Sequence, residues 1–133
     1  MVVSVAEEVE RPAAPILVVE DDPDTREAIV LGLETVGYRV VAAADGLEAL
    51  DLLERGARPC LILLDLMMPI MDGVHFRTEQ LARPDVANIP VIVISAFAQL
   101  TRAHWLRAAD YLPKPIDFDL LLQLVERHCQ TAH

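Results

Sequence analysis

The chain has little cysteine, little positive charge and no long apolar segment, and each shortage excludes a class of protein. Two cysteines occur in 133 residues without a closely spaced pair, which argues against a core held together by disulfides or metal. No stretch reaches the roughly 18 apolar residues that a membrane-spanning helix needs. There are 11 basic and 21 acidic residues, giving a formal net charge of −10. This balance argues against binding to nucleic-acid phosphates or to anionic lipid.

The first residues also lack the features of a secretion signal. No basic start is present, and Glu7, Glu8 and Glu10 interrupt any apolar stretch. We therefore expect a cytoplasmic protein, in which Cys60, at the start of an apolar run, is a buried free thiol. Residues 1–14 contain acids and proline without a sustained period and are predicted to be a flexible acidic tail. Residues 15–130 are predicted to form one domain.

Short apolar runs alternate with helical patterns along the rest of the chain. The runs at 16–19, 38–43, 60–64, 90–94 and 110–113 are predicted strands, and continuous apolarity indicates burial on both faces. Helices are predicted over 23–36, 45–56, 74–82, 99–108 and 117–129, with Asp22, Asp45 and Asp117 as amino-terminal caps. This alternation predicts an α/β fold, (βα)5, with helices on both faces of a parallel sheet.

Polar residues follow the apolar runs at four predicted strand ends: Glu20-Asp21-Asp22, Asp65, Ser95 and Lys114. Carboxyl ends of parallel strands share one edge of the sheet, where ligands bind in such folds. The three aspartates repel one another there, and Mg²⁺ is the hard cation that would offset their charge. An ammonium and a hydroxyl suit phosphoryl oxygens. Asp65, at the end of the central apolar run, is the candidate nucleophile of a phosphoryl transfer.

These residues also carry a family resemblance. The segments ILVVEDD, LILLDLMMPIMDG, VIVIS and DYLPKPID occur in this order at the ends of successive elements. Over roughly residues 15–129 the chain resembles a bacterial response-regulator receiver domain of a two-component system. The resemblance implies a flavodoxin-like, doubly wound sheet of strand order 2-1-3-4-5. It also implies a cis peptide bond between Lys114 and Pro115.

The resemblance further implies a phosphorelay function. Asp65 would accept a phosphoryl group from a histidine kinase or a histidine phosphotransfer protein. Mg²⁺, or Mn²⁺ in its place, would be held by Asp22, Asp65 and the backbone carbonyl of Met67, with Asp21 acting through a metal-bound water. Ser95 and Lys114 would contact the phosphate. No enzyme activity is expected beyond this self-phosphorylation and a slow autodephosphorylation.

A switch follows from the same resemblance. Tyr111 would turn inward as Ser95 moves toward the phosphate, and the change would reach an output surface made of helix 99–108, strand 110–113 and helix 117–129. A downstream output protein would read this surface, and a homodimer through the 99–129 face is a further expectation. Direct binding to nucleic acid or membrane is not expected.

Two departures from the family pattern concern this output surface. Ser95 and Lys114 are 19 residues apart, about one helical turn less than is usual, and Arg107-Ala108-Ala109 stands where a glycine is common. We therefore expect an irregular fourth helix and an altered partner or dimer mode. The chain begins with Met and ends shortly after the last predicted helix, which favours a stand-alone receiver over a piece of a longer regulator.

Two alternatives remain open. One is a pseudo-receiver that binds partners without phosphorylation, which predicts the loss of an acid or of the lysine. The other is a Mg²⁺-dependent phosphatase with Asp65 as its nucleophile. Such enzymes generally need a second acid two residues on and a cap over the substrate, whereas position 67 is Met and no residues are spare for a cap.

Overall fold

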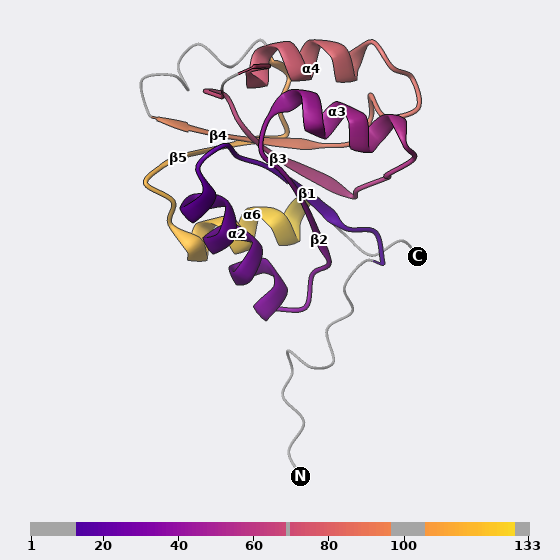
Figure 1. Cartoon of the computed structure of the whole chain (residues 1–133). Coiled ribbons are helices and arrows are strands. Elements are labelled where there is room, and N and C mark those ends of the chain that lie inside the picture. Colours follow the sequence, from indigo (N-terminus) through magenta and orange to yellow (C-terminus); the bar gives the residue numbers. More distant parts are fainter. Residues whose placement is uncertain (1–12, 69, 97–105, 130–133) are drawn as a thin grey trace.

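A computed structural model of the chain describes residues 13–68, 70–96 and 106–129. Its elements, in chain order, are β1 (Ile16–Val19), α2 (Pro23–Thr35), β2 (Val40–Ala43), α3 (Gly46–Glu54), β3 (Leu61–Asp65), α4 (Gly73–Leu81), β4 (Val91–Ala96), β5 (Asp110–Lys114) and α6 (Phe118–His128). The strands form one parallel sheet in the order β2-β1-β3-β4-β5 (Figure 1). The predicted α/β class and flavodoxin-like strand order are confirmed.

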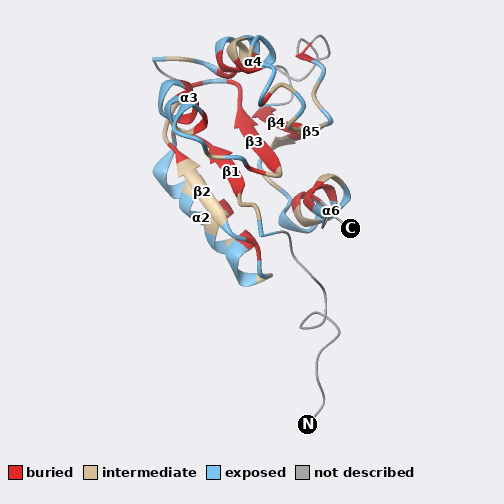
Figure 2. Ribbon diagram, turned by 90° about the vertical axis from the view of Figure 1, so that its right-hand side faces the viewer, coloured by how far each residue is buried: buried red, intermediate tan, exposed pale blue. Residues whose placement is uncertain are grey.

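Helices cover both faces of the sheet, which explains why its central strands are apolar throughout. Successive side chains of a strand point to opposite faces, so each strand contributes side chains to the hydrophobic core on either side of the sheet. Leu17 and Ile62 enter the core beneath α3 and α4. Their neighbours Val18 and Leu63 enter the core beneath α2 and α6. Every residue of β1 and β3 is buried (Figure 2), so an acid at the end of β3 lies at the rim of a dry core.

Aspartates cap the amino ends of α2, α3, α4 and α6. Asp22, Asp45 and Asp72 each accept a hydrogen bond from the backbone N–H three residues on, and Asp117 accepts two from the first turn of α6. Such a cap satisfies an N–H group that the helix leaves without a partner. The caps therefore fix how closely each helix follows the preceding strand.

Several predicted boundaries differ from the structure, and three of the differences concern the site or its surroundings. β4 continues to Ala96 and β5 to Lys114, so Ser95 and Lys114 lie within paired strands. β2 begins at Val40 because Tyr38 belongs to the turn after α2, where its N–H donates to the Leu33 carbonyl. None of the described helices has the length and apolarity that crossing a bilayer requires.

Most of the helix predicted over 99–108 lies outside the described residues, as do residues 1–12 of the predicted tail. The described part, residues 106–108, contains no α-helical residue. At Arg107 the backbone adopts φ 56°, the left-handed region that most side chains avoid. The connection into β5 is thus irregular where it can be seen.

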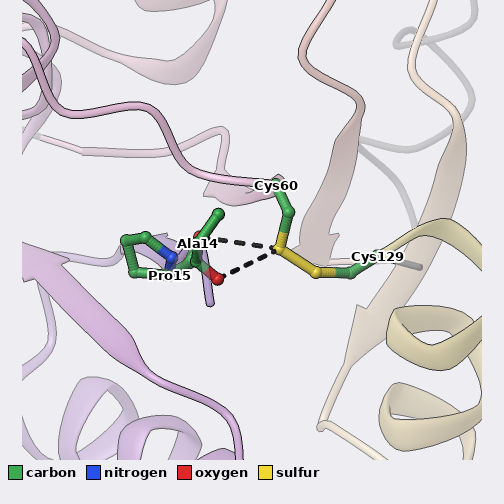
Figure 3. The surroundings of a disulfide bond; sticks show 4 residues. All are labelled: Ala14, Pro15, Cys60 and Cys129. Carbon is green, nitrogen blue, oxygen red and sulfur yellow. Dashed lines mark hydrogen bonds between the residues drawn. A yellow bond between two sulfur atoms is a disulfide. The ribbon is translucent and has the colours of Figure 1, made fainter. Parts of the chain in front are cut away.

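The prediction of a free thiol at Cys60 is wrong, because the structure pairs Cys60 with Cys129 in a disulfide (Figure 3). Cys60 directly precedes β3, and Cys129 is the carboxy-terminal cap of α6. Their Cα atoms lie 5.5 Å apart, within the range that a disulfide requires. The two cysteines are separated by 69 positions in the sequence, so their proximity arises only when α6 packs on the sheet.

A buried arginine holds the irregular connection before β5. Arg77 of α4 is 5% exposed, and its guanidinium donates to the carbonyls of Leu106 and Arg107 at 2.9 and 3.0 Å. It also donates to Gln80 Oε1 at 2.8 Å. Gln80 in turn donates to the Val86 and Ile89 carbonyls. This network satisfies backbone carbonyls that no regular element pairs.

We predict that Arg77→Met lowers the free energy of unfolding by about 3 kcal/mol, because the buried Leu106 carbonyl, the partly buried Arg107 carbonyl and Gln80 lose a charged donor. Arg55→Met is the matched control. Arg55 pairs only with Asp51 across an exposed helix surface, so its replacement is expected to cost less than about 0.5 kcal/mol. Urea unfolding of both variants measures the difference, and equal effects would contradict the role given to Arg77.

Candidate functional site

The carboxyl ends of the strands bring the predicted polar residues to one edge of the sheet. β1 and β3 are direct neighbours, so Glu20 and Asp21, just after β1, come beside Asp65 at the end of β3. β4 and β5 pair so that Ala96 lies opposite Lys114. The sheet order therefore gathers groups that are far apart along the chain.

Three carboxylates meet at this edge. Glu20, Asp21 and Asp65 each place an oxygen within 4.8 Å of the others. Glu20 and Asp65 are only 2% and 3% exposed. The Lys114 ammonium lies 2.7 Å from Glu20 Oε1 and 3.4 Å from Asp65 Oδ2. The Lys114 ammonium therefore pairs with two of the three acids, and the carboxylates outnumber this ammonium in a partly buried site where charges are screened weakly.

This crowding changes the protonation of Asp65. Burial raises the pKa of Asp65 to about 7, together with the hydrogen bond and the negative charge of Glu20, against the opposing effects of Lys114 and the Met67 N–H. Partial burial lowers the pKa of Lys114, but its hydrogen bond to Glu20 and the charge of Asp65 raise the pKa above its ordinary value overall. Lys114 therefore stays cationic at neutral pH, whereas Asp65 lies near its titration point.

Neighbouring groups fix the backbone around the acids. The Met67 N–H donates to Asp65 Oδ1 at 3.2 Å. Arg26 of α2 donates to the Glu20 carbonyl at 2.9 Å and to the Asp21 carbonyl at 3.4 Å. A Cβ at Gly73 would lie 2.6 Å from the Asp65 carbonyl oxygen, so only glycine lets α4 begin this close to β3. The acids are thus held in position despite their mutual repulsion.

Asp22, predicted to bind the metal, is the amino-terminal cap of α2. Its carboxylate is exposed and accepts from both the backbone N–H and the hydroxyl of Thr25. These two hydrogen bonds hold the pKa of Asp22 below its ordinary value. Glu20, which sequence reasoning did not assign to the site, supplies the third carboxylate of the cluster. The acidic group that the structure assembles is therefore shifted by one residue from the predicted one.

Ser95 and Tyr111 lie on the β4–β5 side of the cluster. Ser95 is 1% exposed, and its hydroxyl has no hydrogen-bond partner among the described residues. A buried hydroxyl without a partner is costly, which suits one that awaits a ligand oxygen. Tyr111 pairs with Val93 and packs partly buried against the core beneath α3 and α4. The register therefore places Ser95 and Tyr111 two positions apart on adjacent strands.

The donor set fits a hard divalent cation. All three convergent ligands offer carboxylate oxygens, the atoms that Mg²⁺ and Mn²⁺ prefer. The described part of the chain brings no cysteine or histidine to this group. A divalent ion would offset the excess negative charge and favour the ionised form of Asp65.

Comparison with known proteins finds the same architecture elsewhere. A family model described as response regulator receiver domain matches residues 16–126. An uncharacterized 14.6 kDa protein of Leptolyngbya boryana is 41% identical over 117 residues, which cover 86% of this chain and 88% of that protein. The response regulator MprA of a Mycobacterium species is 40% identical over 110 residues, 80% of this chain but 46% of that longer protein.

A solved structure is similar over nearly its whole length. The receiver domain of sensor histidine kinase PA1611 from Pseudomonas aeruginosa has a TM-score of 0.80 and 34% identity. The match covers 87% of this chain and 97% of that domain, which holds a magnesium ion in its active-site cleft.

The raised pKa of Asp65 predicts how stability depends on pH in the presence of a chelator. The folded state keeps the Asp65 proton up to about pH 7, whereas the unfolded chain releases it near the ordinary value of 3.8. The folded state binds more protons in between, so the free energy of unfolding falls as pH rises through this window. Asp65→Asn removes that fall and is expected to be more stable than wild type above pH 7.

Thermal unfolding between pH 4 and pH 8 measures this difference, and Asp22→Asn serves as control. Asp22 has a lowered pKa, so its contribution is present at neutral pH and is lost in acid, the opposite dependence. An Asp65→Asn profile parallel to that of wild type would contradict the electrostatic account of the cluster.

Proposed function

Because the chain belongs to the response regulator receiver domain family, we propose that it is a phosphoacceptor switch of a two-component system and that Asp65 receives the phosphoryl group. Receiver domains are signalling domains that interact with histidine kinases and output domains. The observation that carries the proposal is the environment of Asp65, a buried carboxylate held 3.4 Å from the Lys114 ammonium among two further acids.

In this proposal a phosphohistidine of a histidine kinase or phosphotransfer protein is the donor. The bond between the histidine nitrogen and phosphorus breaks, an Asp65 carboxylate oxygen forms the new bond, and the imidazole keeps the leaving electron pair. Phosphoryl transfer depends mainly on positioning and charge neutralisation. Lys114 supplies a cation beside the Asp65 oxygen, and the Ser95 hydroxyl supplies a donor without another partner among the described residues.

Glu20, Asp21 and Asp65 would hold the metal ion, with the backbone carbonyl of Met67 as a further oxygen ligand. The magnesium ion of the PA1611 receiver domain supports Mg²⁺ as the ion, and Mn²⁺ fits the same oxygen donors. When bound, the ion neutralises charge that builds up on the phosphoryl oxygens. Arg26 and Gly73 would not bind the ion. Their role is to fix the backbone of Glu20 and of Asp65, which carries the ligand side chains.

A hollow beside Lys114 offers room for the donor. It measures about 320 Å³ and is lined mainly by apolar groups between α2 and the segment after β5: Asp24, Thr25, Ala28, Lys114, Pro115, Ile116 and Phe118. The peptide bond between Lys114 and Pro115 is cis, as expected. A partner whose apolar side chains fill this hollow would bring its histidine close to the Lys114 ammonium.

Phosphorylation would act on β4, β5 and α6. A phosphoryl group adds negative charge and three acceptor oxygens next to Ser95 and Lys114. Movement of Ser95 toward these oxygens would open space for Tyr111, two positions away on the adjacent strand, to turn inward. The surface of β5 and α6 would change with it and present a downstream protein or a second copy with a new contact face.

Neither alternative is favoured. A pseudo-receiver is expected to have lost an acid or the lysine, but Glu20, Asp21, Asp65 and Lys114 all come together. A phosphatase would need an acid two residues beyond the nucleophile, and Met67, 62% exposed, occupies that position.

Incubation with Mg²⁺ and acetyl phosphate tests the function directly. Wild type is expected to gain the mass of one phosphoryl group, and Asp65→Asn is expected to gain none, because the nucleophilic carboxylate is gone. Asp22→Asn is the matched control, since Asn caps a helix about as well as Asp. Intact mass spectrometry reads all three proteins. An unmodified wild type, or a modified Asp65→Asn, would contradict the proposal.

A second experiment identifies the metal ligands. Mg²⁺ titration by calorimetry is expected to show affinity lowered about tenfold or more in Glu20→Gln and in Asp21→Asn, because each removes a charged oxygen ligand. Asp22→Asn is expected to bind as wild type does. Weak Mg²⁺ binding in Asp21→Asn and Asp22→Asn but not in Glu20→Gln would contradict the proposed role of Glu20 and would support the ligands predicted from the sequence.

A further inference from the structure

The disulfide lies at the edge of the sheet opposite to the acidic cluster. It joins Cys60, the residue before β3, to Cys129, the carboxy-terminal cap of α6 (Figure 3). One end of β3 therefore adjoins the disulfide, and the other end carries the Asp65 carboxylate. This bond plays no part in the phosphoacceptor chemistry proposed above.

We propose that the Cys60–Cys129 disulfide is a reversible redox site whose reduction frees the last turn of α6 from the sheet. The co-reactant is a dithiol reductant. A disulfide in a reducing compartment, such as the cytoplasm expected for this chain, is usually transient and redox-sensing rather than a permanent staple. This inference goes beyond the phosphoacceptor function and does not depend on it.

The surroundings of Cys60 suit the reduced state as well as the oxidised one. Its Sγ lies 3.6 Å from the carbonyl oxygens of Ala14 and of Pro15 (Figure 3). A thiol at this place finds an acceptor for its S–H without any movement of the backbone. Cys129 is 3% exposed in the core beneath α2 and α6, where a free thiol packs as a small apolar group. Reduction therefore leaves neither sulfur in an unfavourable environment.

Unequal burial of the two sulfurs sets the order of the exchange. Cys60 is the more accessible residue, so the thiolate of the reductant attacks its Sγ, and Cys129 leaves as a thiolate that takes up a proton. The second thiol of the reductant then attacks the mixed disulfide and releases Cys60. Two electrons and two protons pass to the protein, and the dithiol becomes a disulfide.

The side chains of the last turn of α6, Glu126, Arg127 and His128, are exposed or only half-buried. The buried side chains of the helix, Leu121, Leu124 and Val125, lie in its earlier turns. Beyond Val125, Arg127 and His128 pair with Asp110 at 3.4 and 3.3 Å. Arg127 is 65% exposed, so its ion pair contributes little. Loss of the disulfide therefore removes the covalent tie between this turn and the sheet, while Leu121, Leu124 and Val125 keep the earlier turns packed.

Glutathione buffers of defined ratio and dithiothreitol without denaturant test the proposal on the full chain. Thiol titration and intact mass are expected to show no free thiols in oxidising buffer and two after reduction, with recovery of the disulfide on reoxidation. The oxidised form is expected to melt about 10 °C higher, because the bond closes a long loop. Hydrogen exchange is expected to speed up on reduction at residues 126–129 and not at residues 121–124.

Cys129→Ala provides the control, because it removes the bond but keeps the Cys60 thiol beside its acceptors. It is expected to exchange and melt like reduced wild type in both buffers. Free thiols that persist in oxidising buffer would overturn the proposal. A disulfide that yields to dithiothreitol only in denaturant, or equal exchange of residues 126–129 in both forms, would overturn it as well.

Discussion

Unbalanced charge at the carboxyl edge of the sheet is the constraint on which the rest of the structure depends. Three carboxylates share a partly dry site with one ammonium, an arrangement that costs free energy in the absence of a further cation. The fold holds it because β1 and β3 are buried along their whole length and cannot move apart without exposing both cores. The same unbalanced negative charge suits the site to its proposed chemistry. A divalent ion interacts strongly with carboxylates that are fixed in position, and a phosphoryl group does so with a fixed ammonium.

The fold follows closely from the sequence because its signals are local. Continuous apolar runs in β1 and β3 indicate a sheet covered on both faces, and aspartate caps at Asp22, Asp45 and Asp117 locate the helix starts. The strand order came from family resemblance, and the observed pairing confirms it. Features that depend on contacts between distant segments were not predictable, and they include the Cys60–Cys129 bond and the hydrogen bonds from Arg77 to the connection before β5.

The acids that the structure brings together differ at one position from the predicted metal ligands. Three acids follow β1, and sequence reasoning chose Asp21 and Asp22. Yet Asp22 stands before a proline and three residues before Thr25, a typical helix start, so its carboxylate is committed to capping α2. Glu20, the first residue beyond the buried strand, is then the acid nearest to Asp65 and Lys114. The cap of α2 is thus the physical reason for proposing Glu20 and Asp21, with Asp65, as the metal ligands.

A crystal structure grown with Mg²⁺ and beryllium trifluoride, a mimic of the aspartyl phosphate, tests this account most directly. The account predicts the beryllofluoride on an Asp65 oxygen, within contact of the Lys114 ammonium and the Ser95 hydroxyl, and a metal ion ligated by the carboxylates of the Glu20, Asp21 and Asp65 group. It also predicts that Asp22 still accepts hydrogen bonds from Thr25. Beryllofluoride on another residue, or a metal ion bound through Asp22, would contradict it.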